Sequence, residues 1–219
     1  MRKIIVGAFV SLDGVMQAPG GPEEDPVGGF RHGGWFFPYF DETVGAAVEG
    51  MFAQPFDLLL GRKTYDIFAA HWPYAGPDDP IGALFGRITK YVATRNPALR
   101  LDWENSRSLG DDAVATLRAM KAEDGPDLLT QGSTELLQTL FAEGLVDELF
   151  VWTAPVVLGG GKSLFAPGAS PAALELVDSR ISGTGVVCAR YRVGGPVKTG
   201  SFAFETPTEA ELERRRNLT

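Results

Sequence analysis

The sequence predicts an α/β fold in three layers, in which a mostly parallel central sheet with antiparallel edge strands lies between helices. The first observation is that short apolar, β-rich runs alternate with segments of helical periodicity along the 219 residues. Such alternation is typical of a parallel sheet that is covered on both faces. The second observation is that the last two strand-like runs are joined by a short connecting segment, which indicates antiparallel pairing at one edge.

The predicted strands are short runs rich in β-branched and other apolar residues. They cover residues 3–10, 57–61, 90–94, 127–131, 147–158 and 185–193. The chain begins with two basic residues and an apolar run that turns polar at Ser11, so we interpret this run as a strand and not as a signal peptide. The last run contains the single cysteine, Cys188, for which we expect a buried and unreactive thiol.

The predicted helices repeat apolar residues at helical spacing. They cover residues 38–53, 63–70, 81–87, 111–122 and 133–142. Two of them have start signals that can be read directly. Ser133 follows Gly132 and precedes a stripe of leucines, so we predict that it is an N-cap, and Asp111 or Asp112 has the same role in the helix before it.

We predict one domain over residues 1–195, followed by a segment over residues 196–219 that holds a short strand at 201–205 and a charged, helical end. Residues 17–34 contain six glycines and three prolines, which indicates a long irregular loop inside the domain. Two interpretations of this loop stay open, because it can shape the mouth of a ligand site or cover a partner subunit.

The charge balance limits the possible partners. The chain has 20 Lys and Arg against 28 Asp and Glu, which leaves a net charge of −8. This charge argues against general binding to nucleic acid or to an anionic membrane, and no apolar run is long enough to span a bilayer. One cysteine excludes an intramolecular disulfide, so we expect a cytoplasmic protein.

Three predicted strands end in residues that suit phosphate groups. Residues 57–61 lead through Gly61 into Arg62, Lys63 and Thr64, where a helix begins. Residues 90–94 end in Thr94 and Arg95, and residues 127–131 lead into Gly132, Ser133 and Thr134. Helix N-termini favour anions, and ligands of open α/β sheets bind at the carboxyl ends of the strands. Two alternative interpretations involve no phosphate. Residues 57–65 can be a tight strand-to-helix turn whose cations are solvated, and residues 128–134 can lead into a helix with an ordinary cap.

Two other patterns are weaker. Residues 159–163 resemble the end of a P-loop, but Val156 stands where that motif needs its first glycine, so we interpret this segment as a bend. The chain has two histidines, His32 and His71, and with one cysteine these make a zinc site improbable. We therefore predict no metal.

Taken together, the strand ends at 61–65, 94–95 and 131–133, with Ser11-Leu12-Asp13-Gly14 after the first strand, resemble the dihydrofolate reductase-like superfamily. Residues 11–14 and 155–159 make the chain most similar to stand-alone proteins that resemble the C-terminal reductase domain of the bacterial riboflavin-biosynthesis deaminase/reductase. The resemblance covers residues 1–193. It implies NADPH as cofactor and a homodimer, formed through the edge strand at 185–193.

The resemblance also implies roles for individual residues. The implied cofactor-binding residues are Ala8, Gly14, Gly61, Arg62, Lys63, Thr64, Thr94, Arg95, Gly132, Ser133 and Thr134. Arg62 and Arg95 would lie near the 2′-phosphate, which favours NADPH over NADH. The implied substrate-binding residues are Ser11, Asp13 and Trp152. Asp13 is also the expected catalytic residue, which orients the substrate or relays a proton and needs burial to raise its pKa.

The function that the resemblance implies is hydride transfer from NADPH to an electrophilic carbon of a small heterocycle or sugar-like substrate, by an oxidoreductase that acts on a CH–OH or C=N type group. The expected substrate is 5-amino-6-(5-phosphoribosylamino)uracil or a similar compound. The alternatives are a dihydrofolate or pterin reductase and a non-catalytic NADPH-binding protein. Dihydrofolate reductases carry an acidic residue near the position that Gly45 occupies here, and the nearest carboxylates are Asp41, Glu42 and Glu49.

Overall fold

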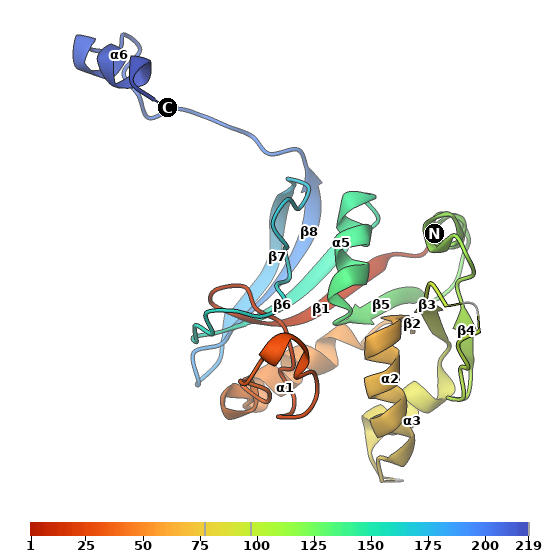
Figure 1. Ribbon diagram of the computed structural model, residues 1–219. Coiled ribbons are helices and arrows are strands. Elements are labelled where there is room, and N and C mark those ends of the chain that lie inside the picture. Colours follow the sequence, from red (N-terminus) through yellow and green to blue (C-terminus); the bar gives the residue numbers. More distant parts are fainter. Residues whose placement is uncertain (77, 97, 219) are drawn as a thin grey trace.

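The computed structural model describes residues 1–76, 78–96 and 98–218, and its centre is an eight-stranded sheet in the order β4-β3-β2-β5-β1-β6-β8-β7 (Figure 1). The strands are β1 (Ile4–Ser11), β2 (Phe56–Gly61), β3 (Lys90–Ala93), β4 (Ser106–Ser108), β5 (Asp127–Gln131), β6 (Glu148–Ala154), β7 (Ala173–Ile181) and β8 (Val187–Gly195). From β4 to β6 all neighbours are parallel, while β8 pairs antiparallel with both β6 and β7. The predicted fold class is confirmed.

The helices before the C-terminal segment cover both faces of this sheet, and the last helix lies apart from it. The helices are α1 (Glu42–Met51), α2 (Arg62–His71), α3 (Pro80–Arg87), α4 (Ala113–Ala122), α5 (Thr134–Ala142) and α6 (Glu209–Arg216), with short 3-10 turns at Val27–Gly29, Phe37–Tyr39 and Trp72–Tyr74. The five helices predicted before the C-terminal segment are all present. The first begins at Glu42 and not at residue 38, because the Asp41 carboxylate accepts a hydrogen bond from Val44 N and caps it there.

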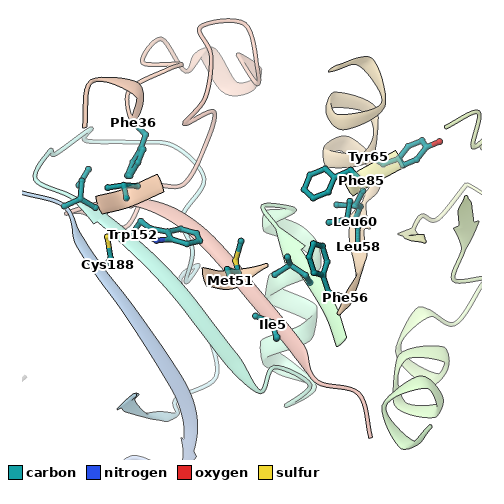
Figure 2. Packing of buried hydrophobic residues seen from close by; sticks show 14 of the residues in the cluster. Ile5, Phe36, Met51, Phe56, Leu58, Leu60, Tyr65, Phe85, Trp152 and Cys188 are labelled. Atoms are coloured by element: carbon teal, nitrogen blue, oxygen red, sulfur yellow. The ribbon is translucent and has the colours of Figure 1, made fainter. Parts of the chain in front are cut away.

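Two hydrophobic clusters fill the space between the layers. Successive residues of a strand point to opposite faces, so Leu58 and Leu60 of β2 enter one cluster and Leu59 enters the other. The first cluster joins α1, α2 and α3 to the sheet, and Figure 2 shows its members Met51 and Phe85 among the other buried side chains. The second cluster holds the leucines of α4 and α5. This two-sided core gives the predicted three layers.

Lys90 begins β3 and is completely buried. Its ammonium donates hydrogen bonds to the carbonyl oxygens of Phe85 at 2.6 Å, Ile88 at 3.0 Å and Gly86 at 3.3 Å, and it lies 4.4 Å from the centre of the Trp103 ring. Burial lowers the pKa of Lys90 to about 8. The side chain thus satisfies the carbonyl groups at the end of α3 and holds this helix against β3.

The sequence predictions about strands were wrong in several places. The strand predicted over 147–158 ends at Ala154, because Pro155 has no N–H to donate to a neighbouring strand. β4 and β7 were missed, since β4 is three polar residues long and β7 is exposed along nearly its whole length, which removes the alternation of apolar and polar residues. β7 is also the true edge, so the strand predicted at 185–193 lies inside the sheet as β8.

The C-terminal segment runs away from the sheet toward α6, at the far upper left of Figure 1. Residues 201–205 form no strand, which corrects the prediction for this stretch, and the side chains of Phe202 and Phe204 are exposed. A strand needs a partner for its backbone groups, and these residues have no strand beside them in the described part of the chain. The predicted helical end is present as α6, capped by Thr208.

Candidate active site

A cavity of about 2020 Å³ lies along the carboxyl ends of the central parallel strands. Most of the predicted site residues line it. They are Ala8, Gly61, Arg62, Lys63, Thr64, Thr94, Arg95, Gly132, Ser133, Thr134 and Trp152. The strand register explains why they meet, because Gly61 pairs with Ala93 across β2 and β3, and Gly7 pairs with Gln131 across β1 and β5. Parallel strands in this register end at the same edge.

Two helix N-termini at this cavity differ from the other helix starts. Within the described residues, α1, α3, α4 and α6 each begin at a side-chain cap, formed by Asp41, Asp79, Asp112 and Thr208. The starts of α2 and α5 have no side-chain cap, and both line the cavity. The first N–H groups of a helix have no partner inside the helix. The cavity therefore receives two sets of backbone donors and the positive ends of two helix dipoles.

Ser133 explains why α5 is uncapped. It occupies the N-cap position, as predicted, but the prediction that its side chain caps the helix was wrong. Its hydroxyl accepts a hydrogen bond from Gly61 N at 2.7 Å and donates one to the Thr64 hydroxyl at 2.8 Å. The backbone of Ser133 is left-handed, with φ of 63°, which turns the side chain toward α2. The hydroxyl thus ties the start of α5 to the start of α2.

Gly61 allows the close approach of Ser133. A Cβ atom at Gly61 would lie 3.1 Å from both Cβ and Oγ of Ser133, so the Ser133 side chain would have to move by a few tenths of an ångström. The φ of Gly61 is −75°, which any residue can adopt. Glycine is therefore favoured here by the close approach of Ser133 and not by an unusual backbone conformation. Gly132 differs, because its φ of 89° lies in the region that favours glycine. Both glycines bring backbone to the cavity wall.

Three cationic side chains accompany the two helix starts. Arg62 and Lys63 are exposed on the first turn of α2, and Arg95 is exposed just after β3. Arg62 forms an ion pair with Asp66 one turn along the helix. The Thr94 hydroxyl accepts a hydrogen bond from Asn96 N at 3.0 Å, which shapes the turn that presents Arg95. Cations at these positions match a phosphate group bound beside α2.

The other end of the cavity is aromatic. The Phe9 ring lies 4.4 Å from the Phe36 ring and 4.8 Å from the Trp152 ring, measured between centres. All three residues line the cavity, and Trp152 is only 2% exposed. Ala8 lies between Gly7 and Phe9 on β1 and lines the same region. This end of the cavity is suited to a flat, uncharged ring.

Ser11, Asp13 and Gly14 do not line this cavity, although the resemblance implied that they would contact ligands. The Asp13 carboxylate accepts hydrogen bonds from Gly159 N at 2.8 Å, Leu158 N at 3.1 Å and the Ser11 hydroxyl at 2.6 Å. These bonds, led by that of Ser11, lower the pKa of the exposed Asp13 to about 2. The expectation of a buried carboxylate with a raised pKa was therefore wrong, and Asp13 instead fastens the turn after β1 to the bend after β6.

The carboxylates near the start of α1 also lie outside the cavity lining. Asp41 is the N-cap of α1, and its pKa is lowered chiefly by the hydrogen bond from Val44 N. Glu42 and Glu49 are exposed on the same helix. None of these three carboxylates is therefore placed to contact a ligand in the cavity.

The long loop shapes the mouth of the cavity, since residues 17–25 line it. Gln17 is buried, and its amide donates hydrogen bonds to the carbonyl oxygens of Asp25 and Val27, both at 2.9 Å. The loop also brings in Glu24, a cavity-lining carboxylate that sequence reasoning missed. The adjacent acidic residues in a Gly- and Pro-rich loop were visible in the sequence, but nothing local indicates which of them turns inward.

The remaining candidates differ, because the exposed His71 lines the cavity whereas Cys188 does not. Cys188 is buried, and burial raises the pKa of its thiol, as expected for an unreactive cysteine. Within the described residues, no three His, Cys, Asp or Glu side chains are grouped as a metal site would require. No helix there is long and apolar enough to cross a membrane.

Comparison with known proteins gives a consistent result. A profile of the RibD C-terminal domain family matches residues 2–188. The chain is 28% identical to the uncharacterized protein YyaP of Bacillus subtilis (strain 168) over 201 residues, which are 89% of this chain and 96% of YyaP.

Three solved structures have similar folds. The putative riboflavin biosynthesis protein of Shewanella sp. PV-4 has a TM-score of 0.60 and 20% identity, over 88% of this chain and 99% of that one. The diaminohydroxyphosphoribosylaminopyrimidine deaminase/5-amino-6-(5-phosphoribosylamino)uracil reductase of Thermotoga maritima has a TM-score of 0.59 and 12% identity, over 88% and 57% of the two chains. The dihydrofolate reductase of Enterococcus faecalis, complexed with NADP(H), has a TM-score of 0.55 and 14% identity, over 87% and 96%.

Proposed function

Because the chain belongs to the RibD C-terminal domain family, we propose that it is an NADPH-dependent reductase of the class that acts on a CH–OH or C=N type group. It transfers hydride to the carbon of a C=O or C=N bond in a small heterocyclic substrate. The observation that carries the proposal is the pair of uncapped helix N-termini, α2 and α5, on one cavity. NADPH carries a pyrophosphate and a separate 2′-phosphate, so it needs two anion sites. The two helix starts, with Arg62, Lys63 and Arg95 beside them, fit that requirement.

Individual residues have distinct roles in this proposal. Backbone N–H groups at Ser133 and Thr134 hold the pyrophosphate, which approaches closely at Gly132. Arg62 and Arg95 bind the 2′-phosphate, and Thr94 shapes the turn that presents Arg95. NADPH, when bound, supplies the hydride. Ala8 and the rings of Phe36 and Trp152 form an apolar slot that positions the nicotinamide and substrate and excludes water.

The substrate class we propose is a pyrimidine of the 5-amino-6-(5-phosphoribosylamino)uracil type. The family match supports this choice over a pterin. The helix that would carry the acidic residue of a dihydrofolate reductase has Gly45 at the matching position, and neither Glu42 nor Glu49 lines the cavity. Pterin reduction would therefore need a carboxylate from elsewhere.

We further propose a homodimer joined along β7. This strand is the edge of the sheet, and its Leu176, Val177 and Ile181 side chains are exposed. An unpaired, apolar edge strand favours pairing with another chain. The domain over 1–195 would form the body of each subunit, and a cytoplasmic location remains part of the proposal. Light scattering measures the subunit number directly.

The test of the proposed function has two stages. NADPH at about 100 times its Kd should stabilise the folded protein by about 2.7 kcal/mol, which raises the Tm by about 5–11 °C for a chain of this size. NADPH oxidation is then followed with the phosphoribosylamino pyrimidine and with dihydrofolate. The proposal fails if NADPH leaves the Tm unchanged. A shift in Tm without oxidation of NADPH would instead identify a non-catalytic NADPH-binding protein.

A further inference from the structure

Glu24 places a carboxylate on the wall of the cavity. Its Oε2 accepts hydrogen bonds from Gly20 N at 2.7 Å and from Gly21 N at 3.2 Å. A Cβ atom at Gly20 would lie 3.1 Å from that same oxygen, so a glycine at position 20 lets the carboxylate reach the loop backbone. Oε1 forms no hydrogen bond with the described residues, which leaves one oxygen available to a ligand.

The loop that carries Glu24 is held in place by buried polar contacts. The Gln17 carbonyl accepts a hydrogen bond from the Trp35 indole at 2.8 Å, and the Gln17 side-chain oxygen accepts one from Lys162 N at 3.0 Å. The Lys162 ammonium forms an ion pair with Asp25, the residue next to Glu24. These contacts join the loop to the glycine bend after β6, so the position of Glu24 is defined by the fold.

Glu24 belongs to the aromatic end of the cavity. Pro19 directly precedes Gly20, and the Pro19 carbonyl accepts a hydrogen bond from Phe36 N at 3.2 Å. The Phe36 ring packs on Phe9, which packs on Trp152. Gly20 and Gly21, whose backbone binds the Glu24 carboxylate, therefore directly follow the residue that contacts Phe36. This contact lies at the end of the cavity that suits the flat ring of a substrate.

The other carboxylates that line the cavity are already engaged or are exposed. Asp79 and Asp112 cap helices, and Asp25 is paired with Lys162. The exposed ones are Glu23, Asp111 and Glu135. Glu24 and Asp79 are both partly buried, and each has one oxygen without a hydrogen bond in the described structure. The other oxygen of Asp79 caps α3, so Glu24 is the one of the two that lies outside a helix cap.

The surroundings of Glu24 favour its protonated form. Burial raises the pKa of Glu24, and the negative charge of Asp25 adds to this effect, while the hydrogen bonds from Gly20 and Gly21 oppose it. The charged neighbours are Asp25, whose charge Lys162 balances, and the exposed Glu23. A carboxyl group with a raised pKa holds more of its proton near neutral pH and is better suited to donate it.

We propose that Glu24 donates the proton that completes substrate reduction. The inference rests on the proposed function, since reduction of a C=N or C=O bond requires a hydride at carbon and a proton at the heteroatom. The hydride comes from NADPH, which is oxidised to NADP⁺. The proton comes from the Glu24 carboxyl group, which is left as a carboxylate and takes up a new proton from water. A new C–H bond and a new N–H or O–H bond replace the double bond.

The test compares Glu24→Gln with Glu23→Gln, a matched change at the exposed neighbour in the same loop. Single-turnover oxidation of NADPH by the phosphoribosylamino pyrimidine is measured across pH, and NADPH affinity is measured by fluorescence. We expect Glu24→Gln to react about 10²–10⁴-fold more slowly. Its rate should also lose the decline that the wild-type protein shows as pH rises through the pKa of Glu24. NADPH affinity should stay unchanged in Glu24→Gln, and the loss of rate in Glu23→Gln should be much smaller than the loss in Glu24→Gln.

A second measurement needs no substrate. Carbon-13 NMR of protein labelled at the glutamate carboxyl carbon follows the titration of Glu24 in the NADPH complex, and the signal is assigned by its loss in Glu24→Gln. A pKa above the ordinary glutamate value supports the proposal, and a pKa at or below it overturns the proposal. Equal rates for Glu24→Gln and Glu23→Gln also overturn it. Failure of the wild-type protein to bind NADPH would refute the proposed function instead, which separates the two outcomes.

Discussion

The hydroxyl of Ser133 is the contact whose loss has the most predictable consequences. Ser133→Ala removes the acceptor of Gly61 N and the donor to the Thr64 hydroxyl. Gly61 is partly buried, and its N–H would have no partner at the junction of β2 and α2. An unsatisfied buried donor costs about 1–3 kcal/mol, so we expect the free energy of unfolding to fall by that amount.

The backbone of Ser133 supplies a matched control. Its φ of 63° is unfavourable for any residue with a Cβ by about 1 kcal/mol. Ser133→Ala keeps this cost, whereas Ser133→Gly relieves it while losing the same hydroxyl. We therefore expect Ser133→Gly to be more stable than Ser133→Ala by about 1 kcal/mol, even though glycine destabilises most other positions.

The assay is urea unfolding of both variants, with the Tm as a second measure. For a chain of this size, 1–3 kcal/mol corresponds to a fall in Tm of about 2–12 °C. A double-mutant cycle with Thr64→Val isolates the hydroxyl pair, for which we expect a coupling energy of at least about 0.5 kcal/mol. The reasoning is refuted if Ser133→Ala unfolds at the wild-type urea midpoint with an unchanged slope.

Three further predictions concern charged residues. Arg62→Ala and Arg95→Ala should weaken NADPH binding more than NADH binding, because the cations face the 2′-phosphate; equal losses in a fluorescence titration would contradict that assignment. The pKa of Asp13, lowered from 3.8 to about 2, stabilises the folded state above pH 3.8, and this stability is lost as pH falls toward 2. The Tm of the wild-type protein should thus decline more steeply over this pH range than the Tm of Asp13→Asn. Parallel curves would contradict a stabilising role for the hydrogen bonds of Asp13. Lys90→Met should lower the free energy of unfolding by about 1–3 kcal/mol at pH 7, because carbonyl groups at the end of α3 lose their donor. Since the folded-state pKa of Lys90 is about 8 and the ordinary lysine value is 10.5, its contribution to stability rises between those pH values, and Lys90→Met should lack that rise in urea titrations. A variant as stable as wild type would show that Lys90 does not hold α3.

The sequence by itself determined the fold class and one end of the site. Apolar periodicity is a local property, and it identified the central strands and five helices within a few residues. Parallel strands then place their carboxyl ends together by topology alone. This is why Gly61, Arg95 and Ser133, which are far apart in the chain, line one cavity.

The tertiary structure decided which polar groups face that cavity. Ser133 does not cap its own helix because Gly61, on another strand, offers a better-placed donor at 2.7 Å. The Asp13 carboxylate is held away from the cavity by hydrogen bonds from backbone N–H groups 145 and 146 residues along the chain. The Glu24 carboxylate is held at the cavity by the N–H groups of glycines in its own loop. The edge strand β7 forms only because β8 lies beside it. A polar side chain forms hydrogen bonds with the groups that the folded chain places beside it. Many of those groups come from distant segments, so a local sequence pattern does not identify them.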